Sequence, residues 1–163
     1  MSSKNPFQVN PHKATMRISV NSAMIGALFF VLTFILTVGS NKFDYLVLLQ
    51  LVLAIPLLYV SVLTYSKIAY LKDNKAWDLF GWIIGYTGNT IVLNAIGLMV
   101  ASISQNIALL YFITIFILMT IYTLINIYFN NVPTKVRLGK FFFFIFIFLI
   151  GGVLPLIKHF LIK

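Results

Sequence analysis

The sequence predicts an all-α bundle of five membrane-spanning helices, and three features of its composition and charge lead to this prediction. Apolar residues make up 61% of the chain, and the mean hydropathy is +1.00, whereas soluble domains are about 45–50% apolar. Charged residues fall into short breaks, and the segments between them hold no Asp, Glu, Lys or Arg: 18–41, 45–66, 79–134 and 141–157. About 20 apolar helical residues cross the roughly 30 Å hydrocarbon core of a bilayer, so 79–134 is long enough for two crossings.

The expected elements follow one another with short polar connections. A polar tail over residues 1–16 precedes one transmembrane domain over residues 17–163. Its helices are expected at about 18–39, 45–66, 79–102, 108–129 and 141–157. The last is the shortest, and Gly151, Gly152 and Pro155 weaken one half of it because glycine and proline disfavour a helix interior. A re-entrant segment is therefore the alternative for 141–157.

Orientation follows from the distribution of the basic residues. With five spans, the tail and the second and fourth connections lie on one side of the membrane. That side carries nine of the twelve basic residues: Lys4, Lys13, Arg17, Lys67, Lys72, Lys75, Lys135, Arg137 and Lys140. Lys42, Lys158 and Lys163 lie on the other side. Because basic loops stay on the cytoplasmic side, the N-terminus is predicted to be cytoplasmic. The predicted location is the cell membrane, with several passes and of microbial cytoplasmic type.

The chain lacks the residues that most enzymes need inside a membrane. It has no cysteine, and its two histidines, His12 and His159, lie near the chain ends. Its three acids, Asp44, Asp73 and Asp78, fall in predicted connections. Hydrolysis, metal binding and haem ligation require such groups at depth, so we expect no enzyme, cofactor or metal. The basic residues lie at the ends of apolar segments, which indicates topology determinants and no nucleic-acid partner.

Neutral polar and small residues carry the remaining information. At 100° per residue, helix 79–102 places small residues along one side and polar residues along the other. The small side is the predicted helix-packing face, formed by Gly81, Gly85, Gly88 and Ala95. Gly81 and Gly85 form a GxxxG pair, which allows close helix contact. The third helix is therefore expected to be the most enclosed.

Two functional hypotheses remain. The leading one is a small non-enzymatic accessory or structural subunit, which packs against copies of itself or against other membrane proteins. The alternative is a channel or facilitator for ions or small solutes, because neutral hydroxyl and amide groups can replace part of a hydration shell. Its polar path would be formed by Ser22, Thr33, Gln50, Ser61, Thr87, Thr90 and Asn94. Besides the bilayer itself, anionic lipids at the basic cytoplasmic loops are a further expected partner.

Overall fold

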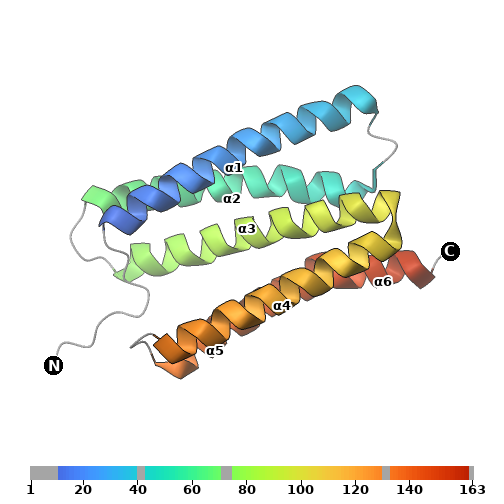
Figure 1. Cartoon of the computed structure of the whole chain (residues 1–163). Coiled ribbons are helices and arrows are strands. Elements are labelled where there is room, and N and C mark those ends of the chain that lie inside the picture. Colours follow the sequence, from blue (N-terminus) through green and yellow to red (C-terminus); the bar gives the residue numbers. More distant parts are fainter. Residues whose placement is uncertain (1–10, 40–42, 71–74, 130–132, 162–163) are drawn as a thin grey trace.

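The computed structural model describes residues 11–39, 43–70, 75–129 and 133–161. Five helical rods fill these ranges (Figure 1). They are α1 (Pro11–Val38), α2 (Tyr45–Tyr70), α3 (Lys75–Ile103), α4 (Gln105–Phe129) and a composite rod of α5 (Thr134–Phe148), the π-helix η2 (Leu149–Val153) and α6 (Leu154–Leu161). Each rod contains a segment of 24 to 28 residues that is long and apolar enough to cross a membrane. The predicted all-α fold with five such helices is therefore confirmed.

Four helices begin earlier than the sequence predicted. α1 begins at Pro11, α3 at Lys75, α4 at Gln105 and α5 at Thr134, so part of the expected polar tail and of three expected connections is helical. The physical reason is that charged residues mark the ends of the apolar segments and do not mark the ends of the helices. Lysine and arginine are good helix formers, and proline is well tolerated at a first helical position, as at Pro11.

The helices form a curved row with α3 at its centre. α1 packs mainly against α2, α2 packs along α3, and α3 also contacts α4 and α5 (Figure 1). In its most apolar stretch, 44% of the α3 residues are buried, against 11–28% in the other four rods. The expectation that the third helix is the most enclosed is therefore confirmed.

The last rod is helical from Thr134 to Leu161 and contains a local irregularity, which we call the break. Its span-length segment is Thr134–Lys158, so a re-entrant turn is not what the chain forms here. The break is the π-helix η2, in which the amide of Leu154 donates to the carbonyl of Leu149. Proline has no amide hydrogen, so Pro155 cannot donate to the carbonyl of Gly151 four residues earlier. Proline and glycine together explain why the helix loosens at this position.

Candidate functional site

The predicted helix-packing face of α3 lies against α2 of the same chain. A Cβ atom built on Gly85 would lie 2.6 Å from the Ser61 Oγ, and one on Gly88 would lie 3.1 Å from a Leu58 methyl carbon. The Tyr65 hydroxyl donates to the carbonyl of Gly81 at 3.1 Å. The glycines thus let the α2 side chains approach the α3 backbone. They, and the fully buried Ala95, are covered inside the bundle.

The predicted path residues do not all lie together. Ser22 and Thr33 are exposed on α1, and the Thr33 hydroxyl donates to the carbonyl of Phe29 in its own helix at 2.8 Å. Ser61, Thr90 and Asn94 are buried, whereas Gln50 and Thr87 are half-buried. Thr90 also donates within its helix, to the carbonyl of Tyr86. Only Gln50 and Asn94 approach a common point, which is Gly151.

We call the group of Gln50, Asn94, Ile147, Gly151 and Gly152 the amide cluster. The Gln50 Nε2 donates to the carbonyl of Gly151 at 2.6 Å, and the Asn94 Nδ2 donates to the carbonyl of Ile147 at 3.1 Å. The Gly151 carbonyl, to which Pro155 cannot donate, therefore accepts its hydrogen bond from the Gln50 side chain of α2. The Gln50 Oε1 and Asn94 Oδ1 are buried without a hydrogen-bond partner.

Glycine is required where the amides approach the break. A Cβ atom on Gly151 would lie 2.5 Å from the Asn94 Nδ2, and one on Gly152 would lie 2.6 Å from the Asn94 Oδ1. The sequence indicated that Gly151 and Gly152 loosen the last helix. It gave no sign that the side-chain amides of Gln50 on α2 and Asn94 on α3 contact the helix there. The sequence analysis therefore missed the glycines as members of a polar cluster.

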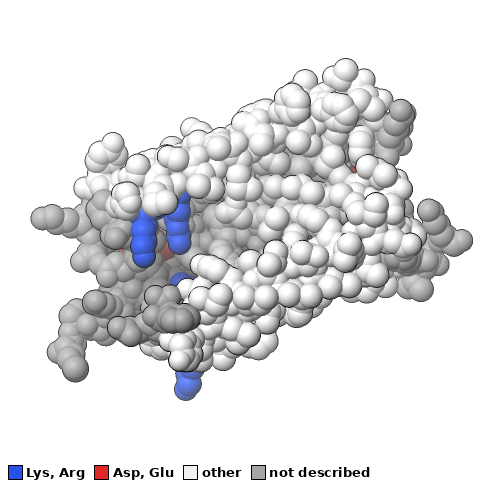
Figure 2. Space-filling view, viewed as in Figure 1, with Lys and Arg blue, Asp and Glu red and all other residues white. Residues whose placement is uncertain are grey.

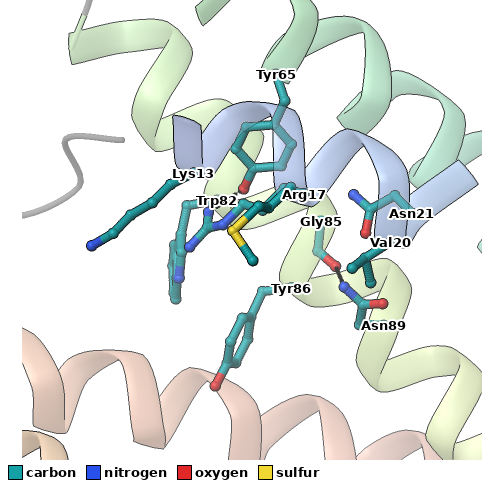
Figure 3. A pocket seen from close by; sticks show the side chains of 10 residues that line it. Lys13, Arg17, Val20, Asn21, Tyr65, Trp82, Gly85, Tyr86 and Asn89 are labelled. Carbon is teal, nitrogen blue, oxygen red and sulfur yellow. Dashed lines mark hydrogen bonds between the residues drawn. The ribbon is translucent and has the colours of Figure 1, made fainter. Parts of the chain in front are cut away.

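A second site lies at the opposite end of α2. It is a cavity of about 490 Å³ between α1, α2 and α3. We call it the basic cavity, and it is lined by Lys13, Met16, Arg17, Val20, Asn21, Tyr65, Trp82, Gly85, Tyr86 and Asn89. Basic side chains gather at this end of the molecule and border a hollow (Figure 2). Figure 3 shows Arg17 beside Trp82 and Tyr65, while Lys13 extends away from them.

Arg17 links three helices at the wall of the basic cavity. Its guanidinium donates to the Tyr65 hydroxyl at 2.5 Å and lies 5.0 Å from the centre of the same ring. Because the Tyr65 hydroxyl in turn donates to Gly81, the chain of contacts runs from α1 through α2 to α3. Charged hydrogen bonds are stronger than neutral ones, so this contact fixes the position of the Arg17 charge.

Aromatic rings form the other wall. Trp82 stacks on Tyr86 with 5.2 Å between the ring centres, and the Lys140 Nζ of α5 lies 5.2 Å from the Trp82 ring. Tyr86 points toward α5 (Figure 3), where it meets Phe144 edge-on. The sequence analysis interpreted the basic residues as topology determinants and as loop contacts for anionic lipids, and not as part of a cavity. The signal in the sequence was that Tyr65 lies 2 residues from Lys67 and Trp82 lies 7 residues from Lys75, but the position of both aromatic residues beside Arg17 (Figure 3) depends on the fold.

The two sites are separated by apolar packing. Along α2, Leu51, Ala54 and Leu58 lie between Gln50 of the amide cluster and Ser61 beside the basic cavity, and all three are at most 1% exposed. Ser61 accepts a hydrogen bond from the Asn21 Nδ2 at 3.0 Å. Within the described ranges, no three His, Asp or Glu residues are grouped so that they would hold a metal ion.

No family model, curated protein or solved structure matches this chain. The class is therefore defined by the fold alone. The part of the chain that the structure describes is all-α and contains five helices long and apolar enough to span a membrane.

Proposed function

We propose that the chain is an integral membrane protein without enzymatic activity, which works by binding transmembrane helices of other chains. The bound helices belong to a second copy or to another membrane protein. The observation that supports this function is the outer face of α1, which lies at the end of the row and packs mainly against α2.

Small residues gather on this outer face. Leu28 and Ile35 are buried on the side of α1 that faces the bundle. On the opposite side, α1 exposes a set of small residues that we call the α1 stripe. It consists of Ser19, Ser22, Ala23, Gly26 and Ala27. They repeat at intervals of three or four residues and so share one face. A Cβ atom on Gly26 would meet nothing within 4 Å, so the surface beside it is open.

The stripe suits helix association in a bilayer. Lipid chains are as apolar as leucine, so membrane helices associate through close packing at small residues and not through hydrophobic exclusion. Gly81, Gly85 and Gly88 of α3 are already covered by α2, whereas the α1 stripe is a small-residue face that the described part of the chain leaves open to a second chain. Its hydroxyls add a capacity for hydrogen bonds between helices.

The channel alternative has less support. The buried apolar residues Leu51, Ala54 and Leu58 separate the two polar sites, and Ser22 and Thr33 lie on the outside of α1. Partial dehydration of an ion requires neighbouring polar groups along its route. The arrangement of these residues therefore argues against a route through a single chain.

The proposed orientation places the basic end on the cytoplasmic side. Among the described residues, Lys13, Arg17, Lys67, Lys135, Arg137 and Lys140 lie near that end and Lys158 near the other. Cysteine replacement tests this orientation because the chain has no native cysteine. We expect Thr134→Cys to react only with a membrane-permeant maleimide in intact cells and Asp44→Cys to react also with an impermeant one. The reverse pattern would contradict the orientation.

Photo-crosslinking in intact membranes tests the partner-binding function. A photoreactive amino acid at Ala23 should give a discrete adduct with another chain, whereas one at Leu118 on the exposed side of α4 should not. Gly26→Ile should abolish the adduct because it fills the open surface of the stripe. The matched control is Gly139→Ile, since Gly139 is also an exposed helical glycine with open space around it. Equal adducts from Ala23 and Leu118, or none from either, would contradict the proposal.

A further inference from the structure

We propose that the basic cavity binds the phosphate headgroup of an anionic membrane lipid, with the upper part of the lipid tail in the same cavity. The inference concerns a different face of the molecule from the α1 stripe, although it shares the proposed membrane location. It rests on four observations: the cations around the cavity, its apolar and aromatic walls, its depth along the helices, and the side on which it opens.

The cations around the cavity come from two helices at the same end of the bundle. Lys13 and Arg17 line the cavity from α1, and Lys140 reaches the Trp82 wall from α5. Arg17 is half-buried and is held by Tyr65. A fixed guanidinium presents several donors in one plane and suits the oxygens of a phosphate. The nearby acid Asp78 is buried in the first turn of α3 and is not among the described lining residues.

The walls away from the cations are apolar. Met16 and Val20 of α1 face the cavity, as do the rings of Trp82 and Tyr86 of α3. A free phosphate ion would gain nothing from these walls and would lose hydration beside them. An amphiphile with a charged head and a hydrocarbon tail matches both parts of the lining. This combination favours a lipid over inorganic phosphate as the source of the anion.

The depth of the cavity agrees with the position of lipid headgroups. α1 has 28 residues and α3 has 29, which at 1.5 Å per residue gives lengths of about 42–44 Å. About 6 Å of each helix therefore projects beyond either side of a 30 Å hydrocarbon core. Lys13 lies within that projecting part, whereas Arg17 and Trp82, about 9–10 Å from their helix starts, lie just inside the boundary. Charged groups at the mouth and apolar groups below follow the order of a lipid headgroup and tail.

The cavity also opens on a side of the bundle that a membrane lipid can reach. α1 and α3 both pack against α2 but are not closely packed against each other, so the space between them faces away from α2. The hollow bordered by basic side chains in Figure 2 lies on this face. A lipid can therefore enter laterally from the bilayer, without passing through the protein.

Fluorescence quenching by brominated lipids tests the proposal directly. The chain has two tryptophans, and Trp77→Phe leaves Trp82 as the only tryptophan, which is excited selectively at the red edge of the absorption band. Protein in phosphatidylcholine vesicles is compared with protein in vesicles that contain either brominated phosphatidylglycerol or an equal fraction of brominated phosphatidylcholine. We expect stronger quenching by the brominated anionic lipid. A basic residue near a membrane surface contributes about 1 kcal/mol to anionic lipid binding, so Lys13→Gln should lower the relative binding constant about five-fold.

Controls separate the cavity from general surface charge and from folding defects. Lys135→Gln removes an exposed cation from the same end but outside the cavity, so it should keep the preference. Val20→Phe fills the cavity without changing any charge and should reduce the preference. Arg17→Gln should abolish the preference for the anionic lipid. Lys13→Gln is the primary test because Lys13 is exposed, so its loss should not unfold the bundle.

Three outcomes would overturn the proposal. Equal quenching by the two brominated lipids would mean that the cavity has no preference for an anionic headgroup. Equal losses with Lys13→Gln and Lys135→Gln would assign the effect to surface potential. Competition by millimolar inorganic phosphate against the brominated anionic lipid would replace the lipid by a free anion as the ligand.

Discussion

The buried amide of Asn94 donates a hydrogen bond to the carbonyl oxygen of Ile147 at 3.1 Å. Asn94 lies in the centre of the bundle and is fully buried, whereas Ile147 lies two residues before the π-helix of the last rod. The bond therefore joins the most enclosed helix to the position where α5 loses its regular geometry. Gln50 adds a second bond to the carbonyl of Gly151, so two helices hold the break from the same side.

Loss of the Asn94 amide should destabilise the bundle. We expect Asn94→Leu to lower the free energy of unfolding by about 1–2 kcal/mol, the range for a hydrogen bond between membrane helices. Unfolding by SDS titrated into mild detergent measures this change. Asn126→Leu is the matched control because the Asn126 Nδ2 donates to the carbonyl of Tyr122 in its own helix at 2.9 Å. A change as large for Asn126→Leu would contradict the role given to Asn94.

A methyl group at Gly151 should be costly because of the same amide. Its Cβ would lie 2.5 Å from the Asn94 Nδ2, and overpacking of a filled site typically costs about 1–3 kcal/mol. Gly139→Ala is the control, since open space surrounds that glycine and alanine is the better helix former. The double variant Gly151→Ala with Asn94→Ala should lose less than the sum of the two single losses. Additive losses, measured by the same titration, would show that the two residues do not interact.

A large side chain at Gly85 should lower the stability of the fold and should not act by blocking association between chains. Gly85→Leu forces a branched side chain against Ser61 and Tyr65 of α2, so we expect a loss of about 3 kcal/mol or more. Gly26→Leu adds the same side chain on the open face of α1 and should leave the unfolding transition unchanged in detergent. Thermal unfolding followed by circular dichroism distinguishes the two. A stable Gly85→Leu variant would mean that α2 does not pack on α3 as described.

The sequence was sufficient for the number of span-length apolar helices because charge and hydropathy mark where each apolar segment ends. It also placed Asn94 and Gln50 among the residues of the predicted polar path, since amides are rare in apolar helices. Helical periodicity shows which residues share a face but not what covers that face. Ser22 and Gly81 therefore looked equivalent as members of polar or small-residue faces, although one is exposed and the other lies under α2.

The basic cavity depends on contacts between distant segments. Arg17 and Tyr65 belong to different helices, and their bond follows from how α1 lies on α2. No local pattern predicts that pairing, because either residue alone is typical of a membrane interface. The same holds for the π-helix. The sequence showed the glycines and the proline that disfavour a regular helix there, but not the side chains of Gln50 and Asn94 that donate to carbonyls in it and just before it.

Flux measurements test whether the amide cluster forms part of a route across the membrane. We expect no flux of common ions or small neutral solutes into proteoliposomes above that into empty liposomes, because Leu51, Ala54 and Leu58 fill the space along α2 between the cluster and the basic cavity. An ion at that position would lose its hydration without gaining polar partners, which costs far more than thermal energy supplies. A flux that Asn94→Leu abolishes, in protein whose helix content is unchanged, would contradict this prediction. It would make the channel alternative the better account of the chain.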